Sequence, residues 1–195
     1  MLTTMPHQVH FQLGHRIGRI FLCLLSAIAG CGPRTHLPLG LILSTNDLPA
    51  NFQAGGTSIQ EIAGGTANFG DYFDSGDTEK VYISIKHKLG IYPSASEATA
   101  AYTSWAPSYF PSAYWEDDGT LQFSPRDPSD PFRFGCMPVT INAVPILSCR
   151  YLQQHSRFIS LILMNTDGEA ITIAQLEHAI DRLDERLFNH RPPED

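Results

Sequence analysis

An alternation of apolar and polar residues between Lys80 and Tyr92 constrains the fold of this chain more than any other pattern. The apolar positions are Val81, Ile83, Ile85, Leu89 and Ile91, and they alternate with Tyr82, Ser84, Lys86 and Lys88. A period of two over this length predicts a strand with one buried face and one solvated face. The chain must therefore build a sheet, and other elements must cover its apolar face.

Two segments carry the signals of amphipathic helices. Ser94 and Glu97 have the spacing of a capping box, and the helix that follows them is predicted to end at Pro107. Thr172 and Gln175 repeat that spacing, and an apolar stripe follows at Ile173, Leu176, Ile180, Leu183 and Leu187. The other faces of this second helix carry charged residues, at Glu177, Asp181, Arg182, Asp184, Glu185 and Arg186. We expect a surface helix that lies on the sheet.

A predicted hairpin completes the recognisable elements. Residues 146–152 and 158–164 flank a short polar turn, and the second of these strands is largely apolar, which places it at the centre of a sheet. Strands joined by hairpins and packed by at least two amphipathic helices predict the α+β class, built on an antiparallel sheet.

The remaining segments have weaker patterns. Residues 44–49 are expected to form a turn or a single helical turn. Residues 53–79 are rich in Gly, Asp, Thr and Ser and are interpreted as loops around a small helix at 58–62. Residues 106–135 are irregular, with one candidate strand at 120–123.

The N-terminus has the order of an export signal. Arg16 and Arg19 precede a short apolar run at residues 20–29, and small residues follow it. A transmembrane helix needs about 20 apolar residues, roughly twice the length of this run. We therefore predict that residues 1–30 are a signal peptide.

The sequence Ile28-Ala29-Gly30-Cys31 resembles the lipobox of bacterial lipoproteins, with Ile28 in place of the usual Leu. The resemblance implies that Cys31 receives diacylglycerol, that the peptide is cut before it, and that the new N-terminus is acylated. Two or more acyl chains hold a protein firmly on a bilayer that it does not span. Residues 31–38 would then be the lipidated Cys and a short tether, and residues 39–190 a single extracytoplasmic domain. The alternative is an ordinary signal peptide, with Cys31 free or in a disulfide.

The order of strand, capped helix, hairpin and closing helix resembles the PsbP/Mog1-type α/β/α sandwich of many bacterial lipoproteins. The residues that carry this resemblance are Asp47-Leu48-Pro49 with Phe52, the stretch Tyr92 to Trp105, and the stretch Cys149 to Leu187 with its ending Asp181-Arg182-Leu183-Asp184-Glu185-Arg186-Leu187. PsbP-like proteins are accessory subunits or assembly factors, so the resemblance implies a non-catalytic role by analogy of fold.

The charge and the cysteine content of the chain limit which partners and which cellular compartment we expect. The chain has 20 acidic and 13 basic residues, and loss of Arg16 and Arg19 with the signal makes the remainder more acidic. This balance argues against nucleic acid as a partner. Cys136 and Cys149 remain as an even pair, which in an oxidising compartment predicts a disulfide, the alternative being two buried thiols.

The sequence holds no catalytic or cofactor motif. A nucleophile elbow and a phosphate-binding Gly loop are both missing. After residue 31, no two histidines are three to five residues apart and none neighbours a Cys at zinc spacing, so we predict neither an enzyme, nor a cofactor, nor a metal. His87 falls in phase with the buried face of its strand, which favours a hydrogen-bonded core histidine. Two acidic clusters suit solvated turns better than calcium, namely Asp71, Asp74, Asp77 and Glu79, and Glu116, Asp117, Asp118, Asp127 and Asp130.

Aromatic residues gather between the first helix and the irregular segment. Trp105, Tyr109, Phe110, Tyr114 and Trp115 lie within eleven residues, among Pro107 and Pro111. They either line a binding groove or cover an open face of the sheet. We therefore expect a membrane-anchored, non-catalytic accessory domain that binds an unknown envelope protein, the alternative being a binding module for a small apolar or sugar-like ligand at residues 105–115. An enzyme assembled from distant residues is the third hypothesis.

Overall fold

The computed structural model describes residues 39–75, 83–111, 115 and 122–191. All of them belong to the compact unit Pro38–Asp195. The predicted signal peptide, Cys31 and Tyr114 lie outside the described residues. Within the part of the chain that is described, no helix has the length and apolar character needed to cross a membrane.

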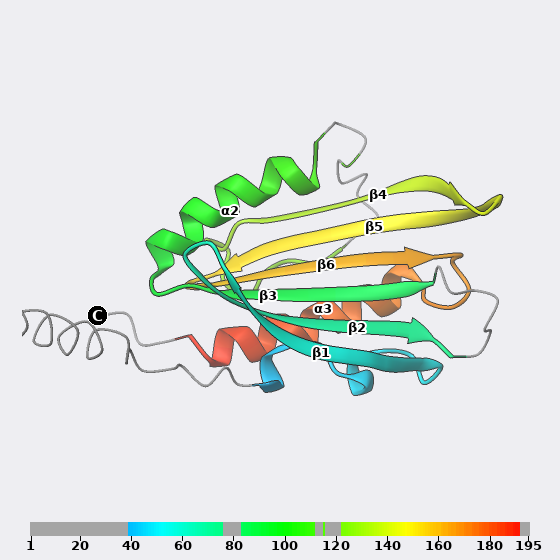
Figure 1. The fold of residues 1–195 in the computed structure, drawn as a ribbon, viewed down its shortest axis with the longest axis horizontal. Coiled ribbons are helices and arrows are strands. Elements are labelled where there is room, and N and C mark those ends of the chain that lie inside the picture. Colours follow the sequence, from blue (N-terminus) through cyan, green and yellow to red (C-terminus); the bar gives the residue numbers. More distant parts are fainter. Residues whose placement is uncertain (1–38, 76–82, 112–114, 116–121, 192–195) are drawn as a thin grey trace, which may run out of the picture. The chain divides into compact units, whose positions relative to one another are not determined.

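Six strands in the described part of the chain form one antiparallel sheet in the order β1-β2-β3-β6-β5-β4 (Figure 1). The strands are β1 (Phe52–Ile62), β2 (Gly65–Asp74), β3 (Ser84–Ile91), β4 (Phe132–Ile141), β5 (Val144–His155) and β6 (Phe158–Thr166). The predicted hairpin is β5–β6, and the apolar β6 is central, as expected. The predicted alternating strand is β3, which pairs with β6.

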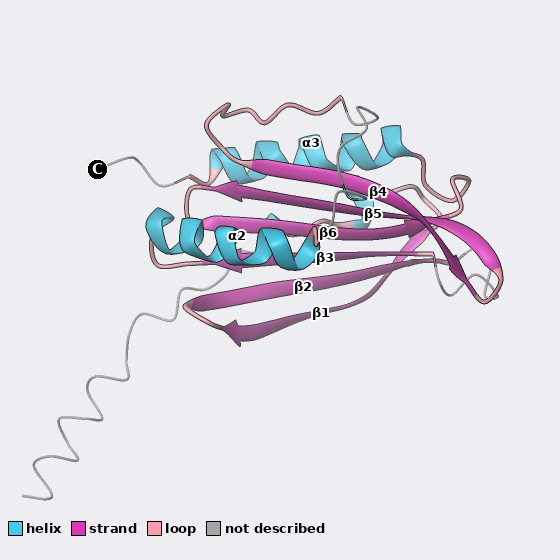
Figure 2. Cartoon of the chain, turned by 90° about the horizontal axis from the view of Figure 1, so that it is seen from above, coloured by secondary structure: helices cyan, strands magenta, loops and turns pink. Residues whose placement is uncertain are grey.

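Helices α2 (Ala95–Tyr109) and α3 (Ile173–Asn189) cover opposite faces of the sheet (Figures 1 and 2). Helix α2 shares a core with Leu152 of β5, whereas Asp184 of α3 contacts the next residue of that strand, Gln153. Neighbouring residues of a strand point to opposite faces, so the helices lie on different sides, which we call the α2 face and the α3 face. The α+β prediction is confirmed.

The predicted caps are present, but α2 is longer than expected. Ser94 accepts a hydrogen bond from the backbone N–H of Glu97, and Thr172 forms a capping box with Gln175. The prediction that Pro107 ends the helix is wrong, because α2 continues to Tyr109 and Phe110 N–H still donates to the Ala106 carbonyl. Proline removes only its own N–H, and in the last turn this costs one bond without stopping the helix.

Residues 53–79 do not form the expected loops around a helix at 58–62. Their described part holds the hairpin β1–β2, which turns at Gly64 with φ +76°. Strand β1 lies at the edge of the sheet, and residues 53–61 are exposed on both faces. An edge strand that is exposed on both faces has no alternating pattern, so its polar sequence resembles that of a loop.

Strand β4 was also missed by the sequence patterns, and the candidate strand at 120–123 is not supported. Gln122 and Phe123 are not in a strand, and residues 120–121 lie outside the described residues. Strand β4 contains Pro138, which usually argues against a strand. It is tolerated here because β4 is the other edge of the sheet, where one N–H need not bond to a neighbour.

The segment before β1 is attached to the α3 face. It forms two single turns, η1 (Leu39–Leu41) and η2 (Thr45–Asp47), the second of which matches the turn expected at 44–49. The carboxylate of Asp47 accepts two hydrogen bonds of 2.9 Å from the Arg186 guanidinium of α3. Burial raises the pKa of Asp47, but the hydrogen bonds from Arg186 and Ser44 outweigh it and hold that pKa below its usual value. This ion pair fixes the start of the described domain to α3.

Candidate functional site: a groove beside helix α2

A groove lies beside α2 on the α2 face of the sheet. Helix α2 packs on β5 and β6, and next to it the described residues leave a hollow of about 290 Å³. Leu163 of β6 and Tyr109 of α2 contribute apolar surface, and the buried Leu161 of β6 borders the hollow. The strands β1 to β3 contribute a mixed polar and aromatic surface, with Ser58, Gln60, Phe69, Asp71, Lys86 and Lys88. We call this hollow the α2 groove.

The alternation in β3 explains why lysines face the groove. Ile85, His87 and Leu89 are buried, and they point to the α3 face. Lys86 and Lys88 are the intervening residues and therefore point to the α2 face. The solvated face that the period of two predicted for this strand is thus part of the α2 groove.

The five predicted aromatic residues separate into two groups. Trp105 and Tyr109 stand on α2, are half-buried, and pack edge to face with ring centroids 6.2 Å apart. Phe110 and Trp115 are buried, and their rings also meet edge to face, at 6.4 Å. Phe110 and Trp115 thus fill a core over β5, whereas Tyr109 lines the groove, and the binding role of these residues remains a prediction.

Trp115 is held in place by its neighbours on the sheet. The Arg150 guanidinium lies over the Trp115 ring at 3.7 Å and donates a hydrogen bond to the Tyr109 carbonyl. Any side chain at Gly135 of β4 would collide with the Trp115 backbone, so this glycine permits the close approach. Trp115 is therefore a core residue, and no feature of the sequence distinguished it from the ring at position 109.

Lys88 has the most unusual environment in the groove. Its ammonium lies 3.9 Å from the centroid of the Trp105 ring and 5.5 Å from that of Phe69. Burial lowers the pKa of Lys88. Across the described residues, no carboxylate lies within ion-pair distance of Lys88 or of Lys86. The groove therefore presents two cations that the described part of the protein does not neutralise.

The α3 face contains a different cluster, centred on His155 at the end of β5. Nδ1 of His155 lies 2.8 Å from Oδ2 of Asp130, and Nε2 lies 3.0 Å from Oδ1 of Asp184. Burial lowers the pKa of His155, but the two carboxylates outweigh it, so that the pKa is raised. The side chains of His155 and Asp184 are 1% and 0% exposed. A solute cannot reach this cluster, which ties α3 to β5.

Asp184 corrects the prediction that it belongs to a solvated face of the last helix. It is buried, and it accepts hydrogen bonds from the Gln153 side chain at 2.8 Å and from the Arg126 backbone N–H at 3.0 Å. Its position, four residues after Ile180 and three before Leu187, is in phase with the apolar stripe. That phase is a signal that could have identified it as a buried acid.

His87 is a core histidine, as its phase predicted. It is 1% exposed, Nδ1 accepts a hydrogen bond from Leu43 N–H at 3.0 Å, and Nε2 lies 3.1 Å from the hydroxyl of Ser160. Burial is the main cause that lowers the pKa of His87, to about 3. With Nδ1 as acceptor, Nε2 carries the proton and donates to Ser160. This pair is inaccessible and attaches the segment before β1 to the sheet.

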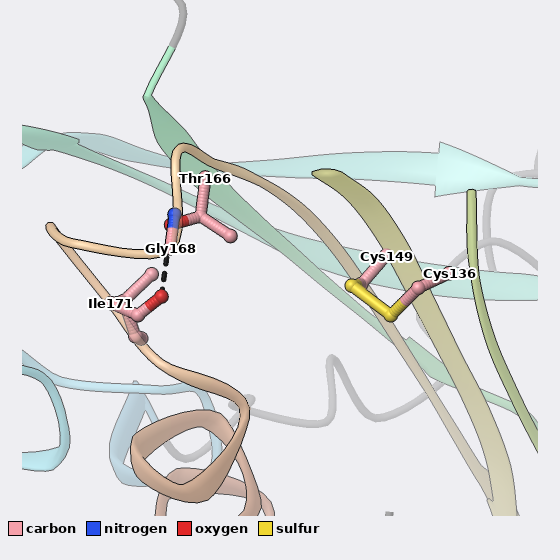
Figure 3. The surroundings of a disulfide bond; sticks show 5 residues. All are labelled: Cys136, Cys149, Thr166, Gly168 and Ile171. Carbon is pink, nitrogen blue, oxygen red and sulfur yellow. Dashed lines mark hydrogen bonds between the residues drawn. A yellow bond between two sulfur atoms is a disulfide. The ribbon is translucent and has the colours of Figure 1, made fainter. Parts of the chain in front are cut away.

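The expected disulfide is present and joins β4 to β5 (Figure 3). Cys136 and Cys149 are direct partners in the register of the two strands. At the last residue of β6, the hydroxyl of Thr166 donates to the Ile171 carbonyl at 2.8 Å and accepts from Gly168 N–H at 3.0 Å, which shapes the turn before α3 (Figure 3).

The two acidic clusters do not converge on a metal where the structure describes them. Asp127 and Asp130 pair instead with the Arg191 guanidinium. Asp77, Glu79, Glu116, Asp117 and Asp118 lie outside the described residues. Among the described residues, no group of His, Cys, Asp or Glu side chains is arranged to hold a metal ion.

Comparisons with known proteins give a structural likeness only. No family model and no curated protein matches the chain. One solved structure, the extracellular domain of PknH from Mycobacterium tuberculosis, is similar with a TM-score of 0.50 and 10% sequence identity. The likeness covers 77% of this chain and 94% of that one. At this identity it shows that the two chains share a fold.

Proposed function

We propose that this protein is a lipid-anchored envelope protein whose domain works by binding a ligand in the α2 groove. The observation that carries the proposal is the groove itself. It combines apolar strand residues, an aromatic side chain of α2 and two lysines without an anionic partner in the described structure. Apolar clefts with a few convergent polar groups are the usual form of a small-molecule site.

Three observations support a location outside the cytoplasm. The lipobox-like sequence before Cys31 supports an anchor, and the Cys136–Cys149 disulfide supports an oxidising compartment. The fold is one that an extracellular domain of another protein also has. The resemblance to PsbP-like accessory domains gives the same expectation of a role without catalysis.

The two buried histidines, His87 and His155, are not placed to act as general bases. A general base must reach the proton that it removes, either directly or through one water molecule. His155 and His87 have partners on both ring nitrogens and are buried at 1% exposure each. The groups that face the α2 groove are suited to holding a ligand through contact area and charge.

A docking face for another envelope protein is the second candidate function. Strand β1 favours it, because residues 53–61 are exposed along an edge of the sheet. Only Glu61 is charged in this stretch, and charges are a common protection of edge strands. A partner strand would add to this edge and would leave the groove open.

The anchor is tested by the intact mass of protein extracted from membranes, beside a Cys31→Ala variant. We expect a chain that begins at Cys31 and carries acyl groups, and we expect the variant to lose both features. An unacylated wild-type chain would refute the anchor and leave the groove proposal untouched.

The groove is tested with the neutral apolar dye phenylnaphthylamine, whose fluorescence rises in apolar sites. Gln60→Trp places a large ring at an exposed position that lines the groove. The matched control is Ala174→Trp, at the shallow hollow between η2 and α3. We expect the dye to bind wild type and the control and to lose about tenfold in affinity in Gln60→Trp. Equal binding by both variants would contradict the proposal.

A further inference from the structure

We infer that the ligand of the α2 groove is a small amphiphilic acid, whose anionic group pairs with Lys88 and whose apolar body lies on Leu163 and Tyr109. This inference rests on the proposed function, because it names the class of molecule that the groove would take. It follows from the charges, the apolar lining and the size of the groove.

The environment of Lys88 indicates an anion. The residue is half-buried, and its ammonium lies near the rings of Trp105 and Phe69. A ring face attracts a cation through its quadrupole, but this attraction is weaker than that of a full negative charge. A partly desolvated cation that has only rings as partners still gains from an anion nearby. Arg150 on the same face differs, because it already donates to the Tyr109 carbonyl.

The charge of the groove opposes the charge of the protein. The chain has a net charge of −7, and yet Lys86 and Lys88 point into one hollow, two residues apart on β3. Asp71 is the acid of the lining, and it is exposed on β2 opposite Lys86 in the register. No ion pair links Asp71 to either lysine within the described residues. A single anionic group near Lys88 therefore meets a net positive surface.

The remaining lining limits the body of the ligand. Leu163 of β6 is the register partner of Lys86, and Phe69 of β2 is the register partner of Lys88, so apolar side chains border the two lysines on the neighbouring strands. The volume of about 290 Å³ is just below the usual range for small-molecule sites, which begins at about 300 Å³. We therefore assign a free small acid and not the headgroup region of a membrane.

The test compares two dyes with the same aromatic body, anilinonaphthalene sulfonate and its neutral parent phenylnaphthylamine. Fluorescence titrations give the affinity of each dye for wild type, Lys88→Gln, Lys86→Gln and Arg182→Gln. Arg182 is the matched control, because it loses one charge at an exposed position on α3. We expect wild type to prefer the sulfonate by about tenfold, as one charge-assisted contact allows. Lys88→Gln should abolish this preference, Lys86→Gln should reduce it, and Arg182→Gln should keep it.

The outcomes separate the two proposals. If the neutral dye binds in the groove and Lys88→Gln leaves the dye preference unchanged, the acid is refuted and the groove proposal stands. If neither dye binds, or if Gln60→Trp does not weaken them, both proposals fail. Competition experiments distinguish a free acid from a lipid headgroup as the ligand. Decanoate should displace the sulfonate dye from the groove. Displacement by anionic lipid vesicles but not by decanoate would contradict the proposal of a free acid.

Discussion

The α3 face of the sheet pairs its buried charges with one another, whereas the α2 groove leaves two lysines without a pair among the described residues. His155 lies between Asp130 and Asp184, and Asp47 is held by Arg186. The Lys88 ammonium on the other face lies near the rings of Trp105 and Phe69, and no carboxylate among the described residues pairs with it. A charge that already has a buried partner is part of the fold, and removing that partner is costly. A charge without one is available to a ligand.

The largest effect on the free energy of unfolding is expected when a buried charge pair of the α3 face is broken. Asp184→Asn keeps the shape of the side chain and removes the charge that faces His155 and Gln153. We expect the free energy of unfolding to fall by about 3 kcal/mol, because one partner of a buried pair is left without its charge. Urea denaturation measures it. Arg182→Gln on the same helix should stay within about 0.5 kcal/mol of wild type, and a loss below about 1 kcal/mol in Asp184→Asn would remove the structural role.

Loss of the disulfide is expected to lower the free energy of unfolding by about as much as Asp184→Asn does. Cys136→Ala with Cys149→Ala opens a link across 13 residues of sequence, and the chain-entropy model gives a loss of about 3 kcal/mol. Denaturation with and without reductant measures the effect. Wild type should fall to the level of the double variant when reduced, and a wild type insensitive to reductant would contradict this prediction.

Two neighbouring residues of β6 compare the packing of the two faces directly. Ile162 is 1% exposed on the α3 face, whereas Leu163 is half-buried and lines the groove. Ile162→Ala should cost about 3 kcal/mol of unfolding free energy, and Leu163→Ala should cost about 1 kcal/mol because it leaves no closed cavity. Equal losses would mean that the groove is filled like a core.

The free energy of unfolding should rise with pH on the acid side and fall with pH on the alkaline side. The pKa of His155 is raised, so its contribution is present below the unfolded pKa of about 6.5 and is lost as pH rises through the folded value. The pKa of His87 is lowered to about 3, so its contribution is present above about pH 6.5 and is lost as pH falls toward the folded value. Each limb has a limiting slope of about 1.4 kcal/mol per pH unit.

Stability should therefore be highest near the pKa of an unfolded histidine. Urea denaturation at several pH values measures both limbs, and His155→Gln should flatten the alkaline one. An unfolding free energy that keeps rising above about pH 7 would contradict the assigned role of His155.

The smallest effect on the free energy of unfolding is expected from a substitution in the α2 groove. Lys88→Met removes a cation that forms no ion pair with a described residue and keeps an apolar stem beside Trp105. The free energy of unfolding should change by less than about 0.5 kcal/mol. A loss above about 2 kcal/mol in thermal or urea denaturation would show that Lys88 is a structural residue, comparable to those of the α3 face.

Elements with one buried side were predictable from the sequence. Strand β3, both helix caps and the β5–β6 hairpin follow from periodicity and capping chemistry, which are local. The β1–β2 hairpin was missed because β1 is exposed on both faces, and β4 was missed because its sequence includes Pro138. Edge strands owe their conformation to the neighbour they pair with, and that neighbour is far away in the sequence.

The site was only partly predictable for a similar reason. Trp105 and Tyr109 were singled out by their type, but the same criterion also selected Trp115, which is buried. Lys88 carried no signal of its own, because its role depends on the register that places it beside Phe69 and under α2. The assignment of residues 105–115 as a binding site remains a prediction, with Tyr114 outside the described residues.

Mapping of amide chemical shifts during titration with anilinonaphthalene sulfonate tests the difference between the two faces most directly. We expect shifts at Gln60, Phe69, Lys88 and Tyr109, with saturation, and no shifts at His155 or Asp184. Shifts centred on the α3 face, or a uniform pattern without saturation, would contradict the assignment of the α2 groove as the site at which this protein binds its ligand.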